Sequence, residues 1–402
     1  MGTKTGIEWT DSTWSPIRFH VKADAAEIAR AKGYSSLVEI AERMAGHVGQ
    51  HCEHISEGCR NCYAEINNHR CLPANGTGLP YDRRARDLIK PFIDEKVLLQ
   101  PLKWKAVVEH TALCRECVSS CSGKERLNRG CIARPRRIFV ENQSDLFAEW
   151  VTDEMRDRVL AAGIVSGHIF QLLTKRAGEM LRYFSDPETS NRVQDQVSEL
   201  TDDYAYQWPY PNIWLGVSVE NQAAADKRIP LLLQTPAAVR YVSCEPLVGA
   251  VDLRHLYGRI NFGDHIDLCV DSLGGKYEAA WHGRESEPRF ANPTGVGKLD
   301  WVICGGESGR GARPMHPDWA RSLRDQCQAA GVPFFFKQWG EWGPCENGEV
   351  TPNPQDWDNP APSHEFQDSD RPRCAQEIVY RVGKKVAGTL LDGREWKQFP
   401  IG

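Results

Sequence analysis

The sequence predicts an α/β fold built as a partial or complete (β/α) barrel of the TIM type, and three observations lead to this class. Six short apolar runs recur between residues 135 and 343, each too short for a helix and too continuous for a half-solvated strand. Amphipathic stretches of helical length lie between several of these runs. Polar or glycine-rich residues follow each run. This alternation is typical of a parallel sheet covered by helices.

In chain order, the predicted strands lie within 135–147, 167–176, 211–222, 238–249, 299–309 and 332–343. The predicted helices cover 153–165, 221–234 and 316–331. Three segments interrupt the alternation: residues 20–50 have a helical pattern, 106–134 are rich in cysteine, and the stretch after 342 is rich in Pro, Asp and Asn. We therefore predict a barrel over 1–343 with two insertions, followed by a loop and a β-rich extension over 344–402.

Composition is that of an ordinary globular protein, with 402 residues, 41% hydrophobic and 26% charged. No apolar run approaches the ~20 residues that span a bilayer, and residues 1–14 lack the pattern of a signal peptide. We therefore expect a cytoplasmic protein without a membrane partner. The net charge of −5 gives no overall attraction to nucleic acid, although basic runs at 81–87 and 133–139 are either phosphate contacts or solvated faces.

Three cysteines lie close together in the stretch "HCEHISEGCRNCYAE", at Cys52, Cys59 and Cys62. In a reducing compartment, clustered thiols indicate a metal site or a catalytic thiol rather than disulfides. Three thiolates can hold three irons of a cubane cluster and leave the fourth iron open, whereas a structural zinc site needs a closed set of four ligands. That fourth zinc ligand could come from one of three nearby histidines, His51, His54 or His69. Spacing alone leaves iron–sulfur, zinc and free thiols open.

A second cysteine group lies in "CRECVSSCSGKERLNRGC", and it comprises Cys114, Cys117, Cys121 and Cys131. Four thiols within so short a segment form a closed ligand set, which predicts either a structural zinc ion or an auxiliary iron–sulfur cluster. The sequence does not choose between the two metals.

Polar side chains follow each predicted strand. Because the carboxyl ends of parallel strands meet at one face of a barrel, these residues predict a common site there. They are Ser144, Asp145, Thr174, Lys175, Arg176, Ser218, Glu220, Cys244, Glu245, residues 305–308, Lys337 and Gln338. In "GGESGRG", consecutive glycines would let backbone amides approach a ligand, and Glu307 could accept a hydrogen bond from it.

Nine motifs in order, among them "TGIEWTDSTWSP", "GCRNCYAE", "FVENQSDLF", "WLGVSVENQ", "WVICGGESG" and "PFFFKQWG", resemble the signature of the phage three-cysteine family. That family, described as phage protein thirty-seven or sixty-eight of unknown function, looks like a divergent branch of the radical S-adenosylmethionine (SAM) enzymes. The resemblance covers most of residues 5–343. It implies a radical SAM barrel whose four-iron, four-sulfur (4Fe–4S) cluster takes an electron from flavodoxin or ferredoxin and cleaves SAM to methionine and a 5′-deoxyadenosyl radical.

The resemblance also implies roles for individual residues. Cys52, Cys59 and Cys62 would hold the cluster; Tyr63, Ser144, Asp145, Ser218 and Glu220 would contact SAM; and Lys175, Glu245, Glu307 and Lys337 would be catalytic residues facing the substrate. The chain departs from the usual radical SAM pattern at three points. Six residues rather than three separate Cys52 from Cys59, Asn61 stands where an aromatic residue usually precedes the third cysteine, and "GGE" comes late in the chain.

Two functions follow as hypotheses. The first is a radical SAM enzyme acting on a nucleic acid or nucleotide, as an isomerase or rearrangement enzyme in phage thymidine hypermodification of DNA in the host cytoplasm. Aromatic side chains that could hold a flipped base are Trp9, Trp14, Trp214, Trp339 and Trp342. The second is a non-catalytic zinc protein that binds nucleic acid on a barrel scaffold.

Overall fold

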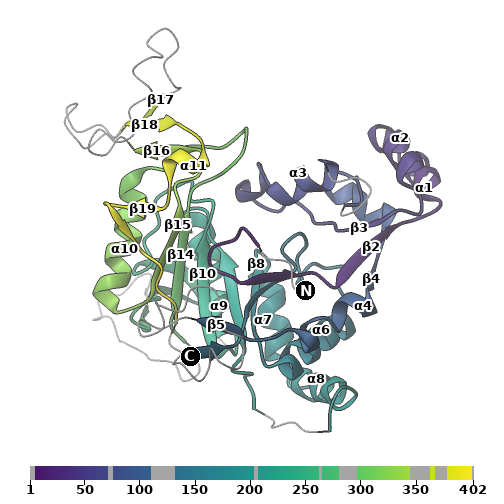
Figure 1. Cartoon of the computed structure of the whole chain (residues 1–402), viewed down its shortest axis with the longest axis horizontal. Coiled ribbons are helices and arrows are strands. Elements are labelled where there is room, and N and C mark those ends of the chain that lie inside the picture. The colour runs from purple at the N-terminus through teal and green to yellow at the C-terminus, as the bar shows by residue number, and fades with distance from the viewer. Residues whose placement is uncertain are drawn as a thin grey trace, which may run out of the picture.

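The computed structural model describes residues 5–70, 76–109, 132–202, 207–261, 265–279, 297–344, 363–366 and 378–400. Its centre is a seven-stranded parallel sheet that curls into a half barrel, with the strand order β1-β7-β8-β9-β10-β14-β15 (Figure 1). The strands are β1 (Ser12–Trp14), β7 (Arg137–Val140), β8 (Ile169–Thr174), β9 (Ile213–Ser218), β10 (Val239–Cys244), β14 (Trp301–Gly305) and β15 (Phe334–Gln338). The predicted α/β class and partial barrel are confirmed.

Helices pack on the convex side of the sheet: α6 (Asp153–Ser166), α7 (Ala177–Ser185), α8 (Thr189–Ser198), α9 (Gln222–Gln234) and α10 (Pro317–Ala330). Local sequence sets where they begin. The Thr152 hydroxyl accepts a hydrogen bond from the Met155 backbone N–H at 3.3 Å at the start of α6, and His316 Nδ1 accepts one from the Asp318 N–H at 3.0 Å at the start of α10. His316 is therefore a helix cap.

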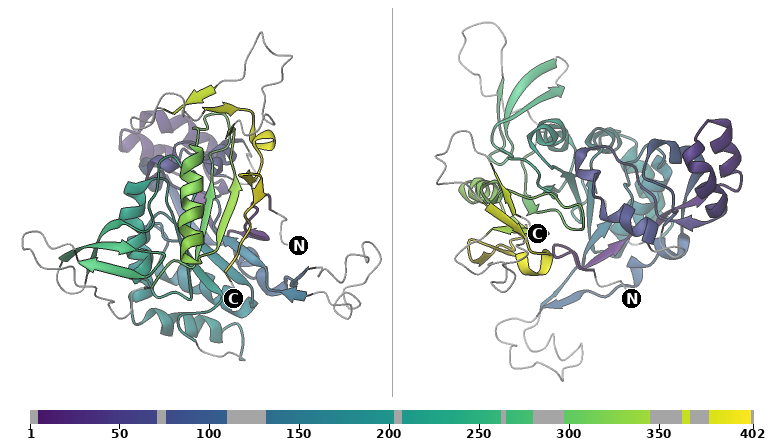
Figure 2. Two further views of the ribbon diagram at one scale, coloured as in Figure 1. Left: turned by 90° about the vertical axis from the view of Figure 1, so that its left-hand side faces the viewer. Right: turned by 90° about the horizontal axis from the view of Figure 1, so that it is seen from above.

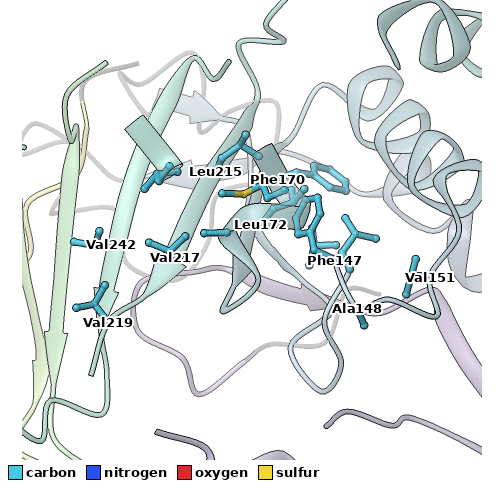
Figure 3. Close-up of a cluster of buried hydrophobic side chains, with 14 of the residues drawn as sticks. Phe147, Ala148, Val151, Phe170, Leu172, Leu215, Val217, Val219 and Val242 are labelled. Carbon is cyan, nitrogen blue, oxygen red and sulfur yellow. The ribbon is translucent and has the colours of Figure 1, made fainter. Parts of the chain in front are cut away.

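Alternation along the strands divides the interior into two cores. On β14, Val302 and Cys304 face the helices, whereas Trp301 and Ile303 face the concave side. Figure 3 shows the helix-side core, where Phe170, Leu172, Leu215, Val217 and Val242 gather with Phe147, Ala148 and Val151 from the segment after β7. The side chains of Cys244 and Cys304 consequently point away from the concave face, although both lie near strand ends.

The lower part of the concave face is filled by a second, largely aromatic core, which comprises Trp9, Phe139, Trp214, Tyr241, Trp301, Ile303 and Phe335. Ile7 and Phe399 pack against it from two distant parts of the chain. Four of the tryptophans expected to hold a base, Trp9, Trp14, Trp214 and Trp339, are at most 3% exposed. They belong to the packed interior, because large aromatic surface is stabilised most by burial.

The chain segment that connects β1 to β7 forms a lobe beside the half barrel (Figure 1). It contains β2 (Ile17–Val21), α1 (Ala25–Ala31), α2 (Ser35–Met44), β3 (Val48–Gly49), α3 (Tyr63–Arg70), β4 (Ile89–Ile93) and α4 (Glu95–Leu98). Strand β2 pairs antiparallel with both β3 and β4. The three-cysteine segment passes between this lobe and the barrel.

Two antiparallel units project from opposite sides of the molecule (Figure 2). One is the ribbon of β5 (Val107–Glu109) and β6 (Ile132–Arg134); the second cysteine group, Cys114, Cys117, Cys121 and Cys131, falls between these strands and lies outside the described residues. The other is the sheet of β11 (Leu256–Asn261), β12 (His265–Asp271) and β13 (Lys276–Ala279). This second unit does not correspond to any strand predicted from the sequence.

The C-terminal part of the chain adds β16 (Trp342–Pro344), β17 (Ser363–Glu365), β18 (Ile378–Arg381), α11 (Lys384–Ala387), β19 (Leu390–Leu391) and β20 (Arg394–Glu395). It returns to the sheet edge, where Lys397 forms an antiparallel bridge with Phe335 of β15. Within the described ranges, every helix is too short or too polar to cross a bilayer.

Candidate functional site

A cavity of about 380 Å³ opens at the carboxyl ends of the sheet strands, above the aromatic core. Its walls come from the strand ends, from the three-cysteine segment and from residues 6–9. The predicted site residues that line it are Cys52, Cys59, Cys62, Tyr63, Ser144, Asp145, Lys175, Ser218, Glu245, Glu307 and Lys337. Three predicted strand-end residues do not line the cavity, namely Glu220, Cys244 and Gly305. Most of the predicted strand-end residues therefore gather around one cavity, and the three cysteines line it with them.

The three-cysteine segment, residues 52–62, turns tightly between its last two thiols. A short 3₁₀ helix (Glu57–Cys59) is followed by a hydrogen bond from the Cys62 backbone N–H to the Cys59 carbonyl at 3.2 Å. All three cysteines are free and face the same cavity. Burial raises the pKa of the Cys52 and Cys62 thiols, and the nearby cations Arg176 and Lys175 act against this shift.

One carboxylate behind the cavity supports the three-cysteine segment from β9. Arg228 donates to Glu220 Oε2 at 2.6 Å and to the Ser218 carbonyl at 2.7 Å, and Glu220 Oε1 accepts from the Gly58 N–H at 3.4 Å. A Cβ at Gly58 would lie 3.1 Å from the Glu220 carboxyl carbon, so a larger residue would push the segment outward. Burial alone would raise the pKa of Glu220, but the bonds and charge of Arg228 outweigh it and lower that pKa.

A second carboxylate, Glu307, holds the same segment from β14. Arg313 donates to Glu307 through Nε at 3.0 Å and Nη2 at 2.8 Å, and its Nη1 reaches Glu57 at 3.0 Å. Asn61 donates to Glu307 Oε2 at 3.0 Å and to the Gly311 carbonyl at 2.7 Å. Glu307 lines the cavity, but these contacts engage both of its oxygens. Its position therefore suits an anchor for the cysteines.

Two of the three histidines that could complete a zinc site contact other groups, although the buried Nε2 of His51 has no hydrogen-bond partner in the described ranges. His51 is fully buried with its Nδ1 3.0 Å from Thr77 Oγ1 and its ring against Tyr81, and burial lowers its pKa to about 3. His54 pairs with Glu65 at 2.9 Å, and His69 is exposed on α3. Across the described ranges, no three His, Cys, Asp or Glu side chains are grouped so that they could hold a single metal ion.

Another wall of the cavity is formed where the pairing between β14 and β15 becomes irregular. The register shifts between Cys304 and Gly305, and Lys337 faces the cavity, where it donates to Glu245 Oε1 at 2.5 Å. A Cβ at Gly306 would collide with the Trp339 carbonyl oxygen. The absence of a side chain at Gly306 thus allows two backbone segments to pack together beside the cavity.

The segments that follow β7 and β8 contain buried polar atoms without hydrogen-bond partners in the described ranges. Asp145 is saturated by Thr174 Oγ1 at 2.8 Å, Arg176 Nη1 at 2.8 Å and the Phe147 N–H at 2.9 Å. In contrast, Ser144 Oγ and the Arg176 Nε and Nη2 atoms are buried without a hydrogen-bond partner in the described ranges. Buried polar atoms are nearly always paired, so these groups indicate a polar ligand.

Glu141 is a cavity residue that the sequence analysis missed. It follows β7 directly, adopts a left-handed backbone with φ 54°, and is 3% exposed. Its Oε1 accepts from the Ile17 N–H at 2.8 Å, and its Oε2 has no partner in the described ranges. Burial and, more weakly, the nearby Asp145 charge raise the pKa of Glu141 well above its usual range. Only the fold shows that this side chain turns inward.

Replacing Glu141 with glutamine is expected to change how stability depends on pH. A carboxyl group whose pKa is raised in the folded state stabilises the fold fully below its unfolded pKa. This contribution is lost as the pH rises through the folded pKa, and the loss in the free energy of unfolding is about 1.4 kcal/mol for each unit of pKa shift. Glu141→Gln cannot ionise. Urea unfolding at pH 4.5 and 7.5 should therefore show a relative gain in stability for the variant at the higher pH. A constant difference between the two proteins would contradict the buried neutral acid.

The two basic runs are largely used inside the protein. In the first, Arg84 pairs with Asp82 at 2.7 Å and Arg86 with Glu53 at 2.5 Å. In the second, Arg134 pairs with Asp11 at 2.7 Å, and Arg136 donates to the Lys105 carbonyl at 2.6 Å while Arg137 lies over the Phe399 ring. Arg86 and the arginines of the second run thus join distant parts of the chain, whereas Arg83 and Arg84 of the first run are exposed.

Comparison with known proteins gives a family but no function. No curated protein and no solved structure matches the chain. A family model described as a protein of unknown function, DUF5131, matches residues 40–400, which include the three cysteines and six of the seven strands that form the half barrel. The chain therefore belongs to the DUF5131 family.

Proposed function

We propose that this protein is a radical SAM enzyme of the phage three-cysteine kind, with a 4Fe–4S cluster on Cys52, Cys59 and Cys62 and a nucleotide or nucleic acid as substrate. The observation that carries the proposal is that three free thiols from one anchored segment line a cavity at the carboxyl end of a partial β/α barrel. When bound, the cluster would supply the electron that cleaves SAM to methionine and a 5′-deoxyadenosyl radical.

The donor set suits an open cluster better than a closed zinc site. In the described ranges, no histidine is grouped with two of the thiols so that they could hold one ion together. Three thiolates leave one iron of a cubane free to bind a small molecule. The carboxylates of Glu220 and Glu307 bind Gly58 and Asn61, so the stretch that carries Cys59 and Cys62 is held against the barrel by protein contacts alone, which supports a preformed ligand segment.

Groups around the cavity support a phosphate-bearing, aromatic substrate. Lys175 lines the cavity and makes no ion pair or hydrogen bond within the described ranges, so its ammonium is available to an anion. Tyr63 is 49% exposed at the same cavity and donates its hydroxyl to the Asn142 carbonyl at 2.5 Å, which fixes its ring as a stacking surface. The ion pair of Lys337 and Glu245 would then transfer a proton or bind polar groups of the substrate.

The test is purification without oxygen, reconstitution with iron and sulfide, and reduction in the presence of SAM. The proposal expects a brown protein with iron and sulfide in equal amounts and formation of 5′-deoxyadenosine. Free nucleotides, single strands and duplex DNA, each with and without altered thymine, then separate substrate classes by the new product they yield. A colourless protein that binds zinc without sulfide would overturn the proposal in favour of a zinc-binding module.

A further inference from the structure

Arg176 lies just after β8, behind Lys175, and is almost completely enclosed, with 9% of its surface exposed. Its Nη1 donates to Asp145 Oδ2 at 2.8 Å, and its backbone N–H donates to Thr174 Oγ1, which itself donates to Asp145. The guanidinium carbon lies 5.5 Å from the centre of the Trp150 ring. These contacts fix one positive charge in the cavity wall.

Two donors of this guanidinium are left over. Nε and Nη2 are buried and have no hydrogen-bond partner in the described part of the chain. A buried donor without a partner costs about 1–3 kcal/mol, so a native protein rarely keeps two in one side chain unless a ligand satisfies them. Arg176 and its neighbour Lys175 line the same cavity as Cys52, Cys59 and Cys62. Two consecutive cations thus face the space that the three thiols share.

We infer that Arg176 is a positioning residue that sets the reduction potential of an iron–sulfur cluster on Cys52, Cys59 and Cys62, through its fixed charge and its two free N–H donors. The inference rests on the proposed function. Thiols bind metal as thiolates, so the loaded segment brings three negative charges into a partly buried site. A fixed cation favours the more negative, reduced form of the cluster, and hydrogen bonds to cluster sulfur act in the same direction.

Asp145 provides a control variant for which the shift in reduction potential should have the opposite sign. Its carboxylate partly cancels the Arg176 charge, and both side chains are at most 9% exposed. Removing the Arg176 charge should therefore make the potential more negative, whereas removing the Asp145 charge should make it more positive. Loosened packing gives no reason for opposite signs.

The experiment is a redox titration of the reconstituted full-length protein without SAM, followed by electron paramagnetic resonance and visible absorption. Arg176→Gln is expected to shift the midpoint to more negative potential, Asp145→Asn to more positive potential, and Arg176→Lys to a value between Arg176→Gln and wild type. Lys384→Met removes a cation that also lines the cavity but whose side chain is 46% exposed, so solvent screening should leave the midpoint nearly unchanged.

Equal midpoints in wild type, Arg176→Gln and Asp145→Asn would overturn the inference, as would shifts of the same sign in both variants. If Arg176→Gln does not fold, Arg176→Lys and Asp145→Asn still test the sign. A wild-type protein that takes up no iron and sulfide refutes the proposed function itself, which distinguishes the two failures.

Discussion

Cys59→Ala is expected to lose the cluster and to abolish 5′-deoxyadenosine formation below detection. Cys59 is 9% exposed in the cavity wall and lies between the two carboxylate anchors, so no other thiol in the described ranges can take its place without moving the segment. Two remaining thiolates are too few to hold a cubane that leaves only one iron open. Iron and sulfide content, together with a SAM cleavage assay under dithionite, measures the effect.

The matched control for this change is Cys269→Ser. Cys269 lies on β12, is half-buried and does not line the cavity. This variant should keep the cluster content and cleavage activity of wild type. Full activity in Cys59→Ala would eliminate the ligand assignment, and equal losses in both variants would mean that cysteine substitution damages the fold in general.

Arg228→Met is expected to destabilise the protein by about 3 kcal/mol, because it leaves the Glu220 carboxylate buried without its cation. The two side chains are 7% and 3% exposed, and Arg228 is bonded to both Glu220 and Ser218. Since Arg228 lowers the pKa of Glu220, its contribution is present above the ordinary glutamate pKa and is lost as the pH falls through the lower folded value. Urea unfolding at pH 7 and at pH 4 measures both the size and the direction.

Arg158→Met provides the comparison for an exposed pair. Arg158 donates to Glu95 on the surface, where the two side chains are 31% and 57% exposed, and its loss should cost less than about 1 kcal/mol. If Arg158→Met and Arg228→Met lost similar amounts of unfolding free energy at pH 7, the stabilising role assigned to the Arg228–Glu220 pair would be refuted. A selective loss in Arg228→Met, joined by weaker iron retention, would connect the β9 anchor to the cysteines.

The sequence predicted the half barrel well because its strands are short and continuously apolar. Residues 167–176 and 332–343 contain β8 and β15, and the predicted helix 316–331 contains α10. Polar residues after these strands pointed to the cavity for a general reason, since parallel strands deliver their ends to one face. Edge strand β1, with three residues, was too short to be distinguished from a loop.

Other parts of the site needed coordinates. Cys244 and Cys304 end their strands, but the two-residue period turns both toward the helices. Glu220 and Glu307 were expected to face cofactor and substrate, and the structure shows each one engaged by an arginine. Long-range pairs of this kind join residues far apart in the chain, and no local pattern reports them. Glu141 escaped notice because its inward direction depends on a left-handed backbone that the sequence does not encode locally.

The aromatic floor beneath the cavity draws on both extremes of the described chain. Ile7 and Phe399 pack against it, and the Trp301 indole donates to the Gln398 carbonyl at 2.9 Å. During translation, the floor therefore stays open until residue 399 has left the ribosome and folded back. The three cysteines leave the ribosome hundreds of residues earlier, so the cavity that they line gains its complete floor only after this later segment has folded back.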